Sequence, residues 1–230
     1  MYLYETHCHT QKVSACSRLT AEDIVELYIK NGYAGVFITD HFLNGNTRIH
    51  LDYPNAAYKE KITAFFDGYK EVKEAAGNRL QVFFGFEYSY RGSDILVYGW
   101  NEEQLKEQER ILQMSMREFC EYCAEQNVLA IQAHPFRQAY YIDHIRLYPE
   151  VEGVEIINSA RDERCNRLAE FYANEYKKIK TGGSDIHIKT QKILSGVAFD
   201  DKLQSERDFI DRLRQGQGTI IQKENVFFEP

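Results

Sequence analysis

The sequence has little of what marks a multidomain, secreted or membrane protein. Its 230 residues include only 4 prolines and no glycine- or serine-rich stretch, so we find neither a linker nor an internal repeat. The 5 cysteines are an odd number at irregular spacings, which is typical of free thiols in a reducing compartment and not of a disulfide framework. No apolar run approaches the roughly 20 residues that a membrane-spanning helix needs. We therefore expect one domain without a membrane segment.

The chain also has fewer basic than acidic side chains, with 28 lysines and arginines against 35 aspartates and glutamates. The formal net charge of -7 argues against an extended nucleic-acid-binding surface. A small phosphorylated substrate is compatible with this charge, because bound metal cations invert the local potential. The first residues, MYLYETHCHT, lack the basic-then-apolar pattern of a signal peptide. Together with the free cysteines, this predicts a cytoplasmic protein.

Short apolar segments alternate with longer helical patterns along the chain. Strands are predicted at residues 2–5, 34–39, 81–86, 95–99, 128–133, 153–157, 178–181, 196–199 and 218–222, and helices at 21–30, 58–76, 102–126, 164–176 and 206–214. This alternation predicts an α/β fold on a parallel sheet, which is either a closed barrel or a doubly wound layer. Thr20, followed three residues later by Asp23, resembles a capping box at the start of the first helix.

Side chains that bind metal ions follow the predicted strands at one end. In a parallel barrel these ends converge on one face, where catalytic residues gather. The residues placed there are His7, His9, Asp40, His41, Glu87, His134, Asn158, Asp185 and His187. Five of the 7 histidines in the chain belong to this set. Imidazole and carboxylate are the ligands favoured by zinc, iron and manganese.

Each of these residues has an ordinary explanation when it is taken alone. A single His-x-His in an extended segment is weak evidence for a metal site, and His41 is explained by the carboxylate of its neighbour Asp40. Glu87 is explained by a solvated strand end. Their common position is harder to explain in this way, because unrelated residues would not gather at the same end of successive strands. The spacing also fits, since His7 and His9 project to the same side of an extended backbone.

The ordered set His-x-His, Asp-His, Glu, His-Pro, Asn and Gly-Gly-Ser-Asp-x-His resembles the polymerase and histidinol phosphatase (PHP) superfamily. These motifs run from His7 to His187, and the strand and helix predicted after them also suit this family. The resemblance implies that residues 1–230 form a single PHP-type phosphoesterase domain with a distorted (β/α)7 barrel of the TIM type. It also implies two or three bound divalent metal ions, which would be zinc, manganese or iron.

The resemblance assigns a ligand set to each metal ion. The first ion would take His7, His9, Glu87 and Asp185, the second would share Glu87 and add His134 and Asn158, and the third would take His41 and His187. Many relatives have another aspartate or histidine about five or six residues after the first motif. This chain has Ala15 there, which cannot bind a metal ion, and Cys16, which can if the loop is shifted by one residue. The third ion is therefore expected to bind most weakly.

Two arginines are candidates for binding a substrate phosphate. Arg137 follows His134-Pro135-Phe136, and Arg161 lies three residues beyond Asn158 at the start of a predicted helix. The guanidinium group suits phosphate because it is planar, always charged and able to donate two parallel hydrogen bonds. The alternative for each is a surface arginine without a ligand.

These features predict a metal-dependent phosphohydrolase. We expect it to hydrolyse a small phosphate monoester, as histidinol phosphatases do, with a hydroxide that bridges the metal ions as the nucleophile. Glu87 would bridge the ions, and His134, His187 or a metal-bound water would protonate the leaving group. Asp40 would orient His41 from behind.

Three alternatives stay open at this point. The substrate could be a phosphodiester, such as a short oligonucleotide cleaved by an exonuclease. The chain could also be a non-catalytic metal-binding regulatory module. Amidohydrolases use His-x-His barrels as well, but they typically bridge their metal ions with a lysine, and no lysine lies at a corresponding strand end here.

Overall fold

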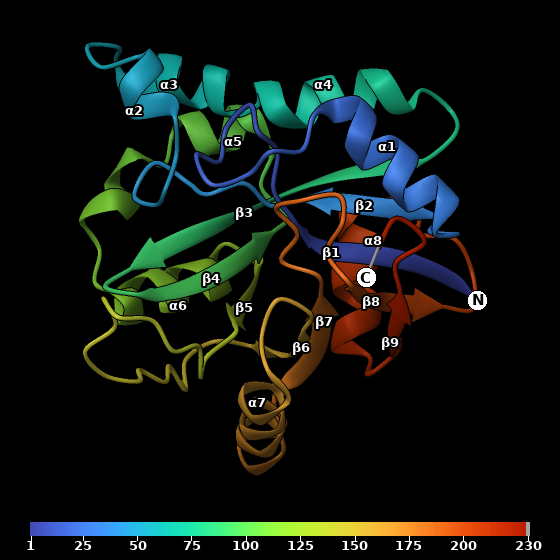
Figure 1. Ribbon diagram of the computed structural model, residues 1–230. Coiled ribbons are helices and arrows are strands. Elements are labelled where there is room, and N and C mark those ends of the chain that lie inside the picture. The colour runs from blue at the N-terminus through green and yellow to red at the C-terminus, as the bar shows by residue number, and fades with distance from the viewer. Residues whose placement is uncertain (229–230) are drawn as a thin grey trace.

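A mixed β-sheet curls into a nearly closed barrel at the centre of the structure (Figure 1). The computed structural model describes residues 1–228, and the sheet has 9 strands in the order β7-β6-β5-β4-β3-β2-β1-β8-β9. They are β1 (Tyr2–Cys8), β2 (Gly35–Ile38), β3 (Gln81–Tyr90), β4 (Ser93–Tyr98), β5 (Leu129–Ala133), β6 (Gly153–Asn158), β7 (Ile179–Gly183), β8 (Ile193–Phe199) and β9 (Thr219–Glu224). A barrel-like α/β fold is confirmed in outline, whereas the expected (β/α)7 strand count is wrong.

An antiparallel strand joins two parallel blocks of the sheet. β1, β2 and β3 run parallel to one another, as do β5, β6 and β7, but β4 is antiparallel to both of its neighbours. The cause is the short β3–β4 connection, in which Arg91 and Gly92 have φ of 49° and 82° and form a tight hairpin turn. The first residues of β4 therefore lie at the same end of the sheet as the last residues of β3 and β5. β8 and β9 extend the sheet beyond β1 as antiparallel strands.

The barrel closes where the end of β1 meets the segment that follows β7. Cys8 forms an isolated parallel bridge with Ile186. The buried Glu5 carboxylate reinforces this seam, because its Oε1 accepts hydrogen bonds of 2.8 Å from the backbone N–H groups of both His7 and Ser184. Burial raises the pKa of Glu5 to about 7. The seam thus holds together the two segments that carry the first and last predicted ligand motifs.

Eight α-helices surround the sheet in the part of the chain that the structure describes. They are α1 (Ala21–Lys30), α2 (Ile49–Asp52), α3 (Tyr58–Phe65), α4 (Asp67–Ala76), α5 (Glu102–Lys106), α6 (Met116–Glu125), α7 (Glu163–Glu175) and α8 (Glu206–Arg214), with a 3₁₀ helix at Glu109–Gln113. In Figure 1, α1, α3, α4 and α5 lie together on one side of the barrel, and α7 packs against β6 on the opposite side.

The sequence predicted the bounds of α1 and α8, and the capping box formed by Thr20 and Asp23 is confirmed. The single helix predicted at 58–76 is interrupted at Phe66. The helix predicted at 102–126 is divided into three pieces, because the Ser115 side chain accepts a hydrogen bond from Glu118 N–H and starts a new helix there.

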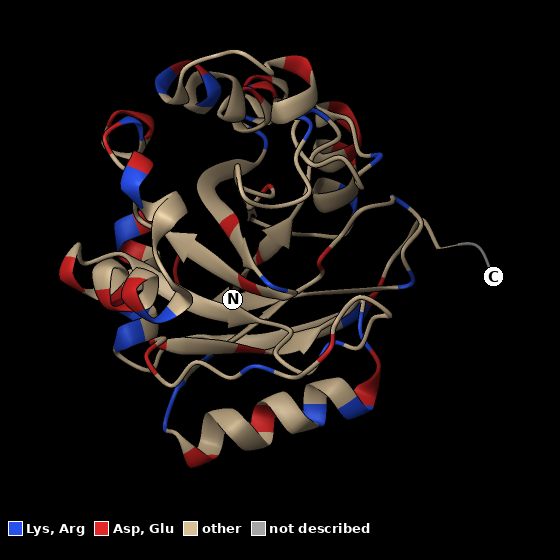
Figure 2. Cartoon of the chain, turned by 90° about the vertical axis from the view of Figure 1, so that its left-hand side faces the viewer, with Lys and Arg blue, Asp and Glu red and all other residues tan. Residues whose placement is uncertain are grey.

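Several buried apolar clusters hold the strands and helices together. One buried cluster combines side chains of the central strands with the apolar face of α8 and includes Tyr4, Phe37, Phe83, Tyr98, Leu129, Phe209 and Leu213. Charged side chains lie mainly on the surrounding helices and loops, with both signs interspersed (Figure 2). None of the helices within residues 1–228 combines the length and the hydropathy that crossing a membrane requires.

Candidate metal centre

Glu87 lies at the centre of the predicted ligands. Its Oε1 is 3.4 Å from His7 Nε2 and 3.3 Å from His134 Nε2. Its Oε2 is 3.5 Å from His9 Nε2 and 2.7 Å from His41 Nδ1. Each carboxylate oxygen thus faces two imidazoles, which is the arrangement expected of a carboxylate that bridges two metal ions. β3 continues to Tyr90, so Glu87 lies within this strand and not after it as predicted.

Asp185 closes the opposite side of the cluster. Its Oδ1 is 3.4 Å from His9 Nε2 and 3.6 Å from His7 Nε2, and its Oδ2 is 3.8 Å from His134 Nε2. The donor atoms form overlapping groups in which all atoms lie within 4.8 Å of one another: His7–His134–Asp185, His7–His9–Glu87, His9–His41–His187 and Glu87–Asp94–His134. Every histidine, aspartate and glutamate predicted as a metal ligand belongs to at least one of these groups.

These buried donor atoms lack hydrogen-bond partners of their own. Within residues 1–228, the unpaired atoms include His7 Nε2, His9 Nε2, His41 Nδ1, His134 Nε2 and both carboxylate oxygens of Glu87. Leaving one buried polar group unpaired costs about 1–3 kcal/mol. Divalent cations satisfy such atoms together, because imidazole nitrogen and carboxylate oxygen are the donors that zinc, manganese and iron prefer. The residues therefore fit the ions that the motifs imply.

Burial and mutual charge set the ionisation of this cluster. Burial would raise the pKa of Glu87, but the neighbouring His41 and His7 outweigh it and hold that pKa well below its usual value. Burial would also raise the pKa of Asp185, and His7 again helps to hold it well below the usual value. Burial lowers the pKa of His9 well below its usual value, so this ring is neutral. Burial would lower the pKa of His7 and His41 as well, but Glu155 beside His7 and Glu87 beside His41 outweigh it and raise both pKa values well above the usual value. The carboxylates and His9 are thus in the form that binds metal ions, whereas His7 and His41 must release a proton when an ion binds.

Asp94 is a candidate ligand that the sequence reasoning missed. It is buried near the start of β4, and its Oδ2 lies 3.9 Å from His134 Nε2. The rule that ligands follow the C-terminal ends of parallel strands does not apply to β4, because this strand runs in the opposite direction. The available signal was an aspartate directly before the strand predicted at residues 95–99.

Asp40 does not orient the His41 ring, contrary to our expectation. Its Oδ1 accepts hydrogen bonds from the Thr10 N–H at 2.7 Å and from the Ser14 hydroxyl at 2.6 Å. Ser14 Oγ in turn lies 3.1 Å from His9 Nδ1. Burial raises the pKa of Asp40 to about 6. Asp40 therefore fixes the loop behind His9 and does not line the cavity of the metal centre.

Asn158 lies beside the cluster but presents its nitrogen to it. Its Nδ2 donates to Glu155 Oε2 at 2.8 Å and to Asp185 Oδ2 at 3.3 Å. Its Oδ1 accepts a hydrogen bond from the Ala160 N–H at 3.0 Å. The oxygen that would bind a metal ion is already engaged, so the structure does not support Asn158 as a ligand. Sequence reasoning also missed Glu155, for which the signal was a glutamate in the middle of an apolar strand.

The third group of donors, His9, His41 and His187, lies beside the loop that departs from the family pattern. Cys16 of this loop lines the same cavity as His41 and His187, whereas Ala15 does not. Burial opposes ionisation of the Cys16 thiol, but hydrogen bonding to His187 and His41 lowers its pKa to about 6. Cys16 is thus the residue of this loop that is placed to reach a third ion.

A cavity of about 550 Å³ opens next to the ligand cluster, and both predicted arginines line it. Arg137 Nη2 lies 2.8 Å from Asp94 Oδ2, and Arg161 Nη2 lies 2.8 Å from Asp185 Oδ2. A third arginine, Arg91 in the β3–β4 turn, also lines this cavity and was not predicted. Three arginine side chains therefore line this cavity, and the carboxylates that line it are all candidate metal ligands.

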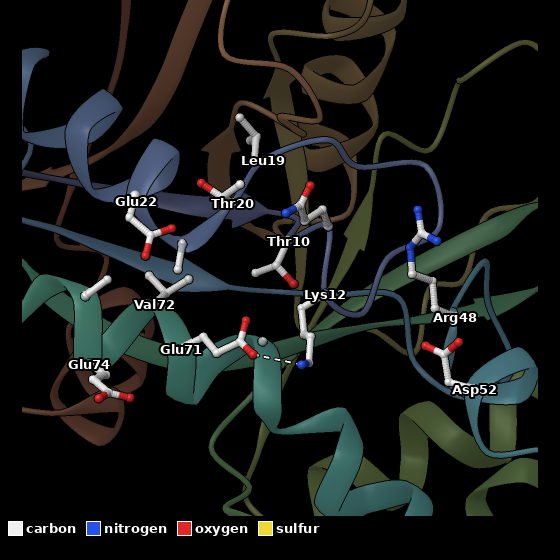
Figure 3. Close-up of a pocket in the computed structure, with 14 residues that line it drawn as sticks. Thr10, Lys12, Leu19, Thr20, Glu22, Arg48, Asp52, Glu71, Val72 and Glu74 are labelled. Carbon is white, nitrogen blue, oxygen red and sulfur yellow. Dashed lines mark ion pairs between the residues drawn. The ribbon is translucent and has the colours of Figure 1, made fainter.

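A larger cavity, of about 740 Å³, lies between residues 10–12, α1, α2 and α4 (Figure 3). Its wall carries an ion pair of 2.8 Å between Lys12 and Glu71, which Figure 3 marks with a dashed line. No member of the four donor groups lines this cavity. If the functional site were chosen by cavity volume alone, this cavity would therefore be chosen in place of the one beside the ligand cluster.

Comparison with known proteins gives structural matches without sequence matches. No family model and no curated protein matches the sequence. A two-domain protein from Bacteroides vulgatus, described as containing a predicted PHP-like metal-dependent phosphoesterase, superposes with a TM-score of 0.67 at 15% identity over 97% of this chain and 65% of its own. PsfC from Pseudomonas syringae superposes with a TM-score of 0.61 at 15% identity over 98% of this chain and 93% of its own.

A protein from Bifidobacterium adolescentis, described as a candidate metal-dependent phosphoesterase, superposes with a TM-score of 0.52 at 16% identity over 92% of this chain and 96% of its own. This chain therefore shares its fold with PHP-like structures, as the ordered motifs predicted. It spans 65% of the length of the Bacteroides protein, which has a further domain.

The donor groups predict the metal content of the protein. Protein purified without chelator should carry at least two transition-metal ions per chain, because Glu87 joins two sets of unpaired histidines. Elemental analysis gives the number directly. A metal content well below one ion per chain, which does not rise after incubation with Mn²⁺, Zn²⁺ or Fe²⁺, would contradict this prediction.

Glu87→Gln should remove more than one ion, since the amide is uncharged and has only one oxygen to share. Glu71→Gln, which changes a glutamate of the larger cavity, is the matched control and should keep the metal content of the parent. Elemental analysis of both variants, with circular dichroism to verify folding, makes the comparison. Two ions retained in folded Glu87→Gln protein would exclude the bridging role.

Proposed function

We propose that this chain is a metal-dependent phosphohydrolase that acts on a small phosphate monoester. The observation that carries the proposal is the position of Glu87, whose two oxygens face two sets of unpaired histidines at the edge of an arginine-lined cavity. The likeness to structures described as PHP-like metal-dependent phosphoesterases supports the reaction class.

Three partly shared ligand sets would hold the ions. His7, His9, Glu87 and Asp185 form one set, His134 with Glu87 and Asp94 forms the second, and His41 and His187 with Cys16 form the third. Asp94 replaces Asn158 in the second set, because the Asn158 oxygen is engaged elsewhere. When bound, divalent ions supply Lewis-acid stabilisation of the phosphoryl group and lower the pKa of water toward neutrality.

Arg137 and Arg161 would bind the phosphate oxygens. Each pairs with an acidic residue through Nη2, and each has a buried Nε without a hydrogen-bond partner. Donor nitrogens thus remain on both guanidinium groups after their ion pairs are formed. Asp94 and Asp185, which pair with these arginines, are also candidate metal ligands. A phosphate bound by the arginines would therefore lie between the guanidinium groups and the metal ions.

His187 would protonate the leaving alkoxide when the third ion is absent. Its side chain is 25% exposed, compared with 0% for His7 and His9, so it is the donor-group histidine most open to the cavity. Its Nδ1–H donates to the Asp185 carbonyl oxygen at 2.8 Å, which leaves Nε2 to exchange a proton with a substrate.

The volume of the cavity favours a small substrate. About 550 Å³ accommodates a small phosphorylated metabolite, and Tyr141 and Arg91 enclose it on the side of the loops. The net charge of -7 also gives an extended polyanion little to bind. A phosphodiesterase or a non-catalytic metal-binding module remains as the outcome to be excluded by experiment.

The substrate class can be tested with metal-loaded protein and a panel of phosphomonoesters and phosphodiesters. We expect metal-dependent release of inorganic phosphate from at least one small monoester, and loss of the activity on chelation. Cleavage of diesters alone would replace the phosphatase with a phosphodiesterase. A protein that binds its ions and cleaves neither class would be a binding module.

Arg137→Lys separates phosphate recognition from metal binding, because lysine keeps the charge and loses the two-pronged donor geometry. We expect kcat/KM for a general phosphomonoester to fall by roughly ten- to a thousandfold, or about 1.4–4 kcal/mol of transition-state stabilisation. Inorganic phosphate should also inhibit the variant more weakly than the parent. Metal content should be unchanged.

Arg110→Lys is the matched control, since Arg110 stacks on Tyr122 with 4.2 Å between Cζ and the ring centroid and does not line the cavity. It should behave as the parent. Equal kcat/KM and equal phosphate inhibition for Arg137→Lys and the parent would make Arg137 a bystander. Arg161 would then be the leading phosphate ligand.

A further inference from the structure

Glu155 is a fully buried carboxylate that touches the ligand cluster from behind. It lies in the middle of β6 and has no exposed surface. Its Oε1 is 2.9 Å from His7 Nδ1. Its Oε2 accepts hydrogen bonds from the His134 backbone N–H at 3.1 Å and from Asn158 Nδ2 at 2.8 Å. One side chain thus contacts two histidines that are supplied by two different strands.

The backbone at this place is strained. His134 and Asp185 have φ of 28° and 50°, in the left-handed region that side chains other than glycine rarely adopt. Such conformations cost of order 1–3 kcal/mol and persist only where neighbouring contacts hold them. Glu155 holds His134 directly through its N–H, and Asn158 connects Glu155 to the Asp185 carboxylate.

Glu155 and His7 both pack closely against Gly183. A Cβ on Gly183 would come within 2.5 Å of His7 Cβ and 2.8 Å of Glu155 Oε1. Glycine is therefore required at this position for the two side chains to meet. The pair is built into the closure of the barrel and is not a surface contact that forms by chance.

We propose that Glu155 is the positioning residue of the metal centre, which sets the ring of His7 and the backbone of His134 at the same time. This inference rests on the proposed metal-dependent function. By accepting the Nδ1–H of His7, Glu155 leaves the His7 Nε2 lone pair facing Glu87 and Asp185. By accepting the His134 N–H, it stabilises the strained backbone that carries the other histidine.

Glutamine cannot replace Glu155 in both contacts. Its one carbonyl oxygen can accept from His7, but its NH₂ group would then face the donors of His134 and Asn158. Aspartate keeps the charge but is shorter by one methylene, so it cannot span His7 and His134 together. The two variants separate the geometry of Glu155 from its charge.

The test is the affinity for Mn²⁺, measured by calorimetric titration of chelator-treated protein. We expect Glu155→Gln and Glu155→Asp each to bind Mn²⁺ about 10- to 100-fold more weakly than the parent. The melting temperature of the metal-free variants should fall, because Glu155 also holds the strained His134 backbone, so Mn²⁺ affinities are compared only for variants that circular dichroism shows to be folded. Glu152→Gln is the matched control, since Glu152 directly precedes β6 and binds Arg214 instead of a ligand.

Parent-like Mn²⁺ affinity in folded Glu155→Gln protein would overturn the proposal. Weakened binding in Glu155→Gln with parent-like binding in Glu155→Asp would also overturn it, because charge alone would then explain the effect. If Glu155→Gln does not fold, the Mn²⁺ affinity of Glu155→Asp decides the question. Loss of affinity in Glu152→Gln as well would count against a specific role. This test measures Mn²⁺ affinity and not hydrolysis. A parent protein that binds Mn²⁺ but cleaves no phosphate ester would therefore refute the proposed function only. The role of Glu155 would still be decided by the Mn²⁺ affinities of its variants.

Discussion

The structure depends on a buried group of imidazoles and carboxylates in which four imidazole nitrogens and both Glu87 oxygens have no hydrogen-bond partners. Glu87, Asp94 and Asp185 bring three buried carboxylates together beside the cavity, and the histidines between them offer lone pairs instead of protons when their rings are neutral. Such a group is costly when it is empty, because buried charges need partners. Arg137 and Arg161 each neutralise one edge of it. Divalent ions would neutralise the centre.

The irregular features of the barrel bring the residues of this buried group together. A tight turn reverses β4 and delivers Asp94 to the end of the sheet where Glu87 and His134 lie. The seam between Cys8 and Ile186 closes the barrel between the first and the last ligand motifs. Backbone strain is present at two of the ligands themselves, which is where strain in proteins tends to be concentrated. The apolar core around α8 is free of these constraints.

The sequence was informative wherever local pattern decides the outcome. The strand ends located His7, His9, His41, His134, Asp185 and His187, the capping box located the start of α1, and the helical pattern located α8. It failed where the direction of a strand matters, since no local pattern showed that β4 runs antiparallel and carries Asp94 to the site. It also failed for groups behind the ligands. The roles of Asp40, Asn158 and Glu155 depend on hydrogen bonds between segments 21 to 148 residues apart in the chain, which spacing does not reveal.

The central claim is that Glu87 joins two divalent ions, and anomalous diffraction tests it most directly. Crystals of the parent protein soaked in Mn²⁺ should give two anomalous peaks, one near each Glu87 oxygen, separated by about 3.5–4 Å as in other two-metal sites. One peak would lie beside His7 and His9 and the other beside His134 and Asp94. A single peak that does not contact Glu87, or no peak in the cluster at saturating Mn²⁺, would contradict the account.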